Sequence, residues 1–342
     1  MIKRLVIIAL LLNVFGSIIS KAEKTAYAYY SNNKLTFRYG EIPENSVQTW
    51  DVSDTGENIP EWSSNSKIRN DIFTVVFHES FAEARPKSCY AWFSDCVFLK
   101  GFVGMEYLNT SEVSNMSRMF AFCSNLSTLD ISMFETGSLT NIKEMFINCK
   151  NLKSINFGNN NFAQVTSLEN LFYGCTWLKE VDLTRFNTSN VTSMYCMFWG
   201  CENIETIDLS SFNTQNIAGI GMSAMFSGCK KLTTIYVGDE WSNERTMYLS
   251  NNTFYNCFRL VGGNGTRYSE PHQSAYYARV DTNETPGYMT YKKSSSGIAT
   301  QYQTENYEIK RYNLSGQLIK KGSTGVNIIR MNDGNTRKVI IR

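Results

Sequence analysis

The chain has 342 residues, enough for one large domain or two ordinary ones, and 42% of them are hydrophobic, which permits a sizeable core. Its 33 basic and 31 acidic residues leave a net charge of +2, which gives no charge-driven preference for nucleic acid or for an anionic membrane surface. Histidine occurs only at His78 and His272, which weakens any prediction of a histidine-based catalytic or metal site.

Residues 1–22 have the three parts of a secretory signal peptide. Lys3 and Arg4 form a basic start, an apolar run follows over residues 5–15, and the small-residue stretch SKA ends at Ala22. The run is shorter than the roughly 20 apolar residues of a membrane-spanning helix; a buried core helix is the alternative interpretation. We therefore expect an exported chain, secreted or held at the cell surface, with no transmembrane span after processing.

Residues 23–88 are expected to form a β-rich N-terminal cap. They lack the repeat that follows, and the stretches KLTFRYG at 34–40 and DIFTVVFHESF at 71–81 have the character of strands. Stacked repeats leave an apolar face open at their end, and an atypical segment normally covers it.

Residues 89–262 are built on an internal repeat of 26 to 28 residues. Seven cysteines mark it, and each has a Phe three positions before it and a Leu or Ile three positions after it. The unit reads MFxxCxxLxxLxLxxFxTxxVxxM. The cysteines of this series are Cys96, Cys123, Cys149, Cys175, Cys201, Cys229 and Cys257.

A unit this short cannot bury its own apolar side, so stacked units must bury one another. The LxxLxL portion ends in the alternation of a short strand, and VxxMxxMFxxC has the spacing of one or two helical turns. The pattern therefore predicts an α/β solenoid of about seven repeats, each with a short parallel strand and a short helix. Its internal ladders are expected to contain Phe120, Cys123, Phe146, Cys149, Phe172, Cys175, Phe198, Cys201, Phe226 and Cys229.

One unit departs from this pattern. In INFGNNNFAQVTSLENLFYGC, the Phe in the middle of the repeat is displaced by two residues, to Phe162. A local distortion of the stack is expected there.

The units LDISMFETGSLTNIKEMFINC and VDLTRFNTSNVTSMYCMFWGC resemble the 26-residue bacterial surface-protein repeat, a leucine-rich-repeat variant of BspA-family surface proteins. The resemblance covers about residues 88–262. Residues 232–290 resemble the closing segment of such proteins in Bacteroidetes-like bacteria. A C-terminal cap is expected at residues 263–293. The resemblance implies a leucine-rich-repeat fold and adhesion to host matrix proteins or to other bacteria.

Residues 294–342 are expected to form a linker and a small β-rich tail. SSSG reads as a flexible linker, and turn signals at LSGQ, KKGSTG and NDGN separate three or four short strands. YNLSGQ, GVNIIRM and the terminal KVIIR resemble the C-terminal type A sorting domain of the type IX secretion system. That resemblance implies attachment or release outside the outer membrane; a final capping hairpin is the alternative.

The sequence predicts no catalytic residue, metal or cofactor. Neither histidine has a Cys, Ser or Asp partner in a known catalytic pattern, and CxxC metal spacing is absent. VGGNGTR closes the repeats and is expected to be a turn rather than a phosphate loop. The ladder cysteines are expected to be small buried hydrophobes, with disulfides between adjacent repeats and metal binding as alternatives.

Cys196 lies five residues before the ladder residue Cys201. The same position in other repeats is variable and mostly polar. Cys196 is therefore expected to face outward as a free surface thiol, a site for intermolecular crosslinking rather than catalysis.

The outward face of the predicted strands is the candidate binding site. Stacked carboxylates such as Asp182 and Asp208 repel each other, which a bound cation or a basic partner would relieve; a solvated face is the alternative. An extended concave surface suits a macromolecular partner, so we expect a non-catalytic adhesion protein that binds a protein or extracellular-matrix partner. A surface coat without a specific partner and an accessory enzyme module are the alternatives. The candidate residues are Asp130, Asn156, Asp182, Asp208 and Tyr236.

Overall fold

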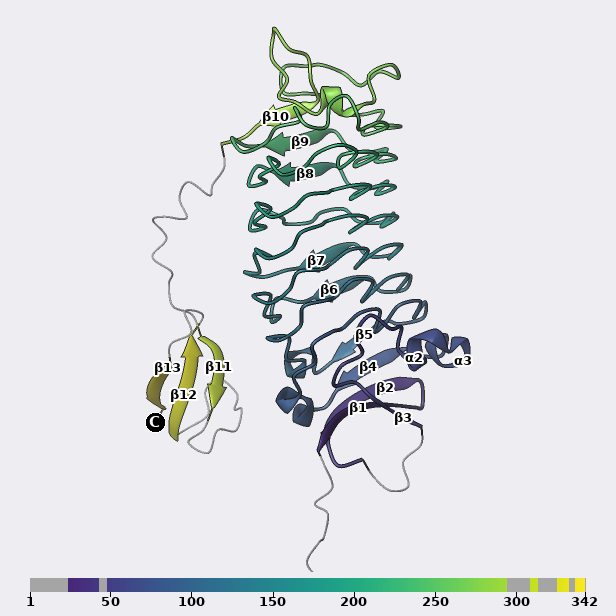
Figure 1. The fold of residues 1–342 in the computed structure, drawn as a ribbon, viewed down its shortest axis with the longest axis vertical. Coiled ribbons are helices and arrows are strands. Elements are labelled where there is room, and N and C mark those ends of the chain that lie inside the picture. The colour runs from purple at the N-terminus through teal and green to yellow at the C-terminus, as the bar shows by residue number, and fades with distance from the viewer. Residues whose placement is uncertain (1–23, 43–47, 294–307, 313–324, 332–335, 342) are drawn as a thin grey trace, which may run out of the picture.

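The computed structural model describes residues 24–42, 48–293, 308–312, 325–331 and 336–341. The predicted signal peptide at 1–22 and the start of the predicted linker lie outside the described residues. Figure 1 shows the repeats of the chain stacked one above another along the long axis of the molecule.

A five-stranded sheet lies at the N-terminal end of the stack. Its strands are in the order β3-β1-β2-β4-β5, with β1 and β2 forming an antiparallel hairpin and β4 and β5 adding in parallel. The expected strand at 34–40 is β2, whereas that at 71–81 shortens to β4 because a 3-10 helix, η1, follows it. The elements are β1 Thr25–Ser31, β2 Lys34–Gly40, β3 Thr49–Asp51, α2 Glu61–Ser64, α3 Ser66–Arg69, β4 Thr74–Phe77, η1 Glu79–Glu83 and β5 Gly101–Val103.

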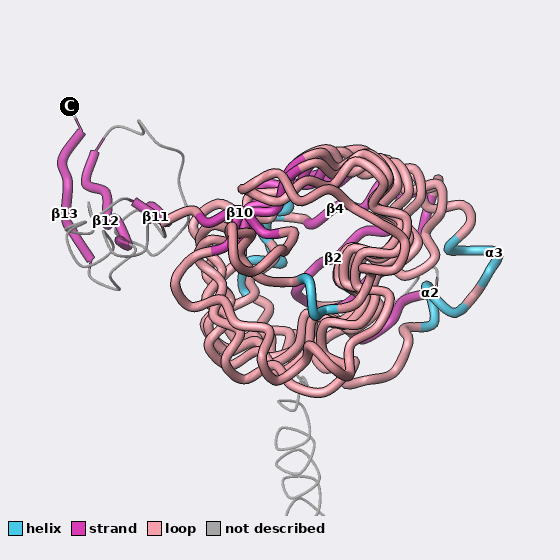
Figure 2. The backbone as a smooth tube through the Cα atoms, turned by 90° about the horizontal axis from the view of Figure 1, so that it is seen from above, coloured by secondary structure: helices cyan, strands magenta, loops and turns pink. Residues whose placement is uncertain are grey.

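The repeats contain little regular secondary structure. Seen along the stack, they superpose as rounded outlines made mostly of loop (Figure 2). β6 pairs with β7 in one parallel sheet, and β8, β9 and β10 form another. The elements are η2 Met105–Tyr107, β6 Thr128–Asp130, β7 Ser154–Asn156, β8 Thr206–Leu209, β9 Thr234–Val237, η3 Ala275–Tyr277 and β10 Met289–Tyr291.

The expected leucine-rich-repeat solenoid, with a strand and a short helix in every repeat, is wrong. Residues 89–262 are all described by the structure and contain no α-helix; the described α-helices, α2 and α3, both precede them. The strands are also divided among small separate sheets rather than joined in one continuous sheet.

Two left-handed residues in every repeat prevent the expected helix. They lie five positions and one position before the ladder cysteine, as with Arg118 and Phe122, whose φ angles are 56° and 59°. A right-handed helix cannot pass through such residues. The other pairs are Ala91 and Asp95, Glu144 and Asn148, Asn170 and Gly174, Cys196 and Gly200, Ala224 and Gly228, and Asn252 and Asn256.

The backbone of these turn segments bonds between repeats instead. The N–H of Arg118 donates to the carbonyl of Lys143 at 3.0 Å, and the N–H of Phe120 donates to the carbonyl of Met145 at 3.0 Å. The alternate N–H groups close tight turns within the repeat, as from Met119 to the carbonyl of Met116. Every second N–H thus donates to a carbonyl of the neighbouring repeat. In a helix, the same N–H groups would bond to carbonyls of their own segment.

A stack of phenylalanines fills the core. Seven fully buried rings, one per repeat, follow one another with centroids 5.4 to 5.9 Å apart. From Phe120 to Phe172 the planes of successive rings differ by only 4°. The rings in order are Phe93, Phe120, Phe146, Phe172, Phe198, Phe226 and Phe254.

The seven ladder cysteines are fully buried free thiols, and those from Cys123 to Cys257 each have a hydrogen-bond acceptor. The Sγ of Cys149 lies 2.9 Å from the carbonyl oxygen of Phe120 in the preceding repeat, which also accepts the N–H of Cys123. The equivalent contact recurs in every repeat from Cys123 to Cys257, at 2.9 to 3.2 Å. Burial raises the pKa of Cys149 to about 12, so the thiol remains a protonated donor.

The C-terminal end of the stack is held by a buried carboxylate. Asp281, 6% exposed, accepts hydrogen bonds from the N–H groups of Asn264 and Thr266, from the hydroxyl of Thr266 and from the N–H of Gly287. The glycine-rich VGGNGTR segment is therefore a loop wrapped around this carboxylate, as its turn character predicts.

The described part of the C-terminal tail is a three-stranded antiparallel sheet in the order β11-β12-β13. The strands are β11 Glu308–Tyr312, β12 Gly325–Met331 and β13 Thr336–Ile341.

Replacing Phe172 by Ala should lower the free energy of unfolding by about 3–5 kcal/mol, because its ring is fully buried between Phe146 and Phe198. Urea denaturation of the full chain measures the change. Trp177→Ala, at an exposed position, is the control and should change stability by less than about 0.5 kcal/mol. Equal losses in the two variants would contradict the phenylalanine stack as the main core.

Candidate functional site

The five candidate residues of the strand face lie on successive repeats. Asp130, Asn156 and Asp182 are exposed, and Asp208 and Tyr236 are partly exposed. Asp130 lies beside Asn156 in the pairing of β6 with β7, and Asp208 lies beside Tyr236 in the pairing of β8 with β9. The structure therefore brings these residues into one line, which we call the strand face.

The acidic and amide side chains of the strand face have a local structural role. Each accepts a hydrogen bond from the N–H two residues later, at 2.9 to 3.0 Å, and so closes the turn that ends the strand segment. The acceptors are Asp130, Asn156, Asp182 and Asp208, and the donors are Ser132, Gly158, Thr184 and Ser210. This requirement explains Asp and Asn at the position without any ligand.

Two of the carboxylates also have a side-chain partner from another repeat or from beyond the repeats. The Nδ2 of Asn156 donates to Asp130 at 3.1 Å, and the Nζ of Lys292, beyond β10, lies 2.5 Å from Asp208. The same ammonium lies over the ring of Tyr236, 5.3 Å from its centroid. The cation that balances Asp208 is thus supplied by the chain itself.

The ion pair changes the titration of Asp208. Partial burial by itself raises the pKa of this carboxyl, but hydrogen bonds from Lys292 and Ser210 outweigh it and hold the pKa below its usual value. The pKa of Lys292 is raised, chiefly by its hydrogen bond to Asp208.

The strand ladder opens between β7 and β8. Glu180, Val181 and Asp182 occupy the strand position of their repeat, yet they form no strand and no backbone hydrogen bond to either neighbour. The opening follows the unit in which Phe162 is displaced. Phe162 still reaches the core, with its ring 4.5 Å from that of Phe186.

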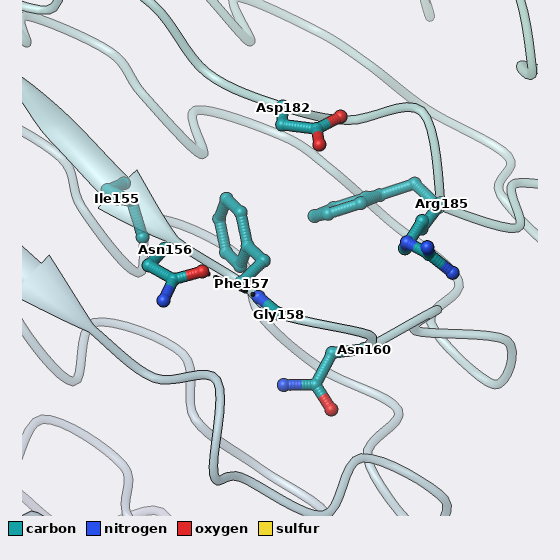
Figure 3. A pocket seen from close by; sticks show the side chains of 8 residues that line it. Ile155, Asn156, Phe157, Gly158, Asn160, Asp182 and Arg185 are labelled. Atoms are coloured by element: carbon teal, nitrogen blue, oxygen red, sulfur yellow. Dashed lines mark hydrogen bonds between the residues drawn. The ribbon is translucent and has the colours of Figure 1, made fainter. Parts of the chain in front are cut away.

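A shallow pocket lies at this opening, with a volume of about 60 Å³. Figure 3 shows Asp182, Arg185 and Asn160 placed around it, with the ring of Phe157 between them. Phe186 also lines the pocket. One oxygen of Asp182 caps Thr184, whereas its other oxygen and the guanidinium of Arg185 have no hydrogen-bond or ion-pair partner in the described structure. These two groups, Asp182 on the strand face and Arg185 beside it, are the unengaged charges at the pocket.

The prediction that Cys196 faces outward is wrong. Its side chain turns inward at a left-handed residue, with φ of 53° and an exposed fraction of 5%. Burial raises the pKa of its thiol, a hydrogen bond with Tyr195 opposes this, and the carboxylate of Glu169 adds to it. The thiol is therefore shielded and protonated, which makes it a poor site for crosslinking.

The two histidines have structural neighbours. His78 contacts Arg38 and bonds Ser80 at the start of η1, and His272 bonds Ser269 and stacks on Tyr277. Across the described residues, no three His, Cys, Asp or Glu side chains are grouped to hold a metal ion. The same part of the chain contains no helix with the length and apolarity needed to cross a bilayer.

Comparison with known families gives one match. Residues 103–157 and 150–260 match the family model described as Mycoplasma protein of unknown function, DUF285, a surface-repeat family of BspA-like type. The matched segments span residues 103–260, less than half of the chain. No curated protein and no solved structure matches. The repeats thus resemble a surface-repeat family, and this match includes neither the N-terminal cap nor the tail.

Replacing Lys292 by Met should raise the pKa of Asp208 towards its ordinary value, because the charge-assisted hydrogen bond is lost. A lowered pKa adds stability that is present above the ordinary carboxyl pKa, near 4, and is lost as the pH falls through the folded-state pKa. Unfolding of the variant should thus depend less on pH below about 4, with a loss under about 1 kcal/mol at pH 7 because both groups are partly solvated.

Carboxyl-detected NMR titration of Asp208 measures this shift. Lys293→Met, at the exposed neighbouring residue, is the matched control and should leave the titration unchanged. An unmoved pKa in the Lys292 variant would contradict the ion pair.

Proposed function

We propose that this chain is an exported, non-catalytic surface protein that binds a protein or extracellular-matrix partner through the strand face. The observation that carries the proposal is the opening of the ladder at Asp182 and Arg185. There, two unengaged charges stand in a line of exposed polar side chains contributed by successive repeats. An extended surface of this kind suits a macromolecule that contacts several repeats at once.

Two further observations support this proposal. The repeats match a surface-repeat family, which favours a location outside the cell. The pocket of about 60 Å³ is far smaller than the roughly 300–1,000 Å³ of small-molecule sites, which disfavours an enzyme active site there.

A second candidate function is a surface coat without a specific partner. The turn-closing hydrogen bonds of Asp130, Asp182 and Asp208 favour it, because they give the strand-face carboxylates a structural reason to be present. The two candidates differ in whether any partner binds saturably.

Binding of the full processed chain to a panel of immobilised host matrix proteins tests the proposal, and surface plasmon resonance gives the affinity. Saturable binding should be weakened at least tenfold by Asp182→Lys, which reverses the unengaged charge. Glu205→Lys, at an exposed residue of the neighbouring repeat whose side chain has no partner among the described residues, should leave the affinity unchanged. Absence of saturable binding to every surface by a folded chain would favour the coat function.

We also propose that residues 1–22 direct export and that the tail at 294–342 is a type IX sorting signal, which places the protein at the cell surface or in the medium. The described tail strands, with β12 between β11 and β13, support a compact sorting unit. A reporter carrying both segments should reach the surface or medium of a bacterium with type IX secretion. The same reporter without 294–342 should stay in the periplasm; periplasmic retention of both would rule the sorting role out.

A further inference from the structure

We propose that the pocket at the ladder opening binds the edge of a terminal sugar on a glycan carried by the partner. This inference rests on the proposed function, because it names the chemistry that the same strand face would recognise. It concerns the one place on the described strand face where the backbone ladder is open and two charges are unengaged.

The opening brings polar side chains next to two aromatic rings of the core. The strand segments on either side are joined by regular pairing, from Thr128 to Ser154 in β6 and β7 and from Thr206 to Thr234 in β8 and β9. Residues 180–182 between them are not paired. The pocket therefore lies in a break in the sheet, where side chains from two repeats meet (Figure 3). The rings that line it, Phe157 and Phe186, are largely buried.

The polar groups around the pocket offer acceptors and a donor side by side. Asp182 supplies a carboxylate oxygen, Arg185 supplies guanidinium N–H groups, and Asn160 uses its Nδ2 to bond the carbonyl of Ile131, which leaves its amide oxygen as an acceptor. Neighbouring hydroxyl groups on a sugar can donate to a carboxylate and accept from a guanidinium at the same time. Two neighbouring hydroxyl groups therefore match the acceptors and the donor of the pocket better than a ligand group that only donates or only accepts hydrogen bonds.

The charges and the size of the pocket narrow the ligand class further. An anion would face the carboxylate of Asp182 and a cation would face Arg185, whereas a neutral hydroxylated ring meets neither repulsion. The rings of Phe157 and Phe186, 5.1 Å apart and nearly perpendicular, give an apolar floor for the C–H groups of such a ring. About 60 Å³ holds only the edge of the ring, so the rest of the ligand must extend outside.

Saturation-transfer NMR with the full chain and a panel of methyl glycosides, covering hexoses, N-acetylhexosamines and fucose, tests the inference. At least one glycoside should bind saturably with a Kd in the millimolar range. Asp182→Asn keeps the oxygen that caps Thr184, and Arg185→Gln replaces the exposed guanidinium by a shorter neutral amide, so both variants should fold. Each should weaken binding of that glycoside at least tenfold. Glu205→Gln and Arg259→Gln, at exposed residues outside the pocket, should leave the Kd unchanged.

Lack of binding by every glycoside, or binding that both pocket variants retain, would overturn the inference. Glycine is included as a zwitterion, and its competition for the pocket in place of a sugar would also overturn it. The outcome for the proposed function is distinguished by a separate binding measurement. If the chain binds a matrix protein equally well before and after periodate destroys the sugar diols, the partner is recognised through protein and only the glycan inference is lost.

Discussion

Backbone hydrogen bonds between successive repeats are the interaction on which the rest of this structure depends. In each repeat, two left-handed residues turn the chain so that alternate N–H groups point at the carbonyl groups of the next repeat. A left-handed conformation is unfavourable for most residues, by about 1–2 kcal/mol. Here the neighbouring repeat satisfies backbone groups that would otherwise be buried without partners, which offsets that cost.

The spacing set by these bonds determines the core. It places one Phe per repeat in a continuous stack, and it brings each ladder thiol to the carbonyl of the Phe in the preceding repeat. Cysteine suits this position because it is small, apolar and still able to donate. A larger apolar side chain would not fit between the repeats at this spacing. Ala would leave the carbonyl oxygen of the preceding Phe with only one hydrogen-bond donor.

The strand side of the stack is less strictly specified, and the candidate site arises there. Its polar residues first serve to close turns, and most then find partners within the chain, as Asp208 does with Lys292. Phe162 is displaced by two residues within a repeat of unchanged length, and the ladder opens in the repeat that follows. One carboxylate oxygen of Asp182 and the guanidinium of Arg185 have no partner among the described residues at that opening, which is why the functional proposals concern them.

The sequence by itself determined the repeat, its length, the Phe and Cys columns and the outward line from Asp130 to Tyr236, because one residue type recurs wherever one environment recurs. It also marked the unit with the displaced Phe. The tertiary structure alone decided that the turn segments are not helical. Apolar residues spaced three and four apart occur both in a helix and in successive tight turns that bond to the neighbouring repeat. It also decided that Cys196 is buried and that Lys292, 84 residues away in sequence, neutralises Asp208. Both depend on which repeats lie side by side, and a pattern within one repeat carries no information about contacts made by the next.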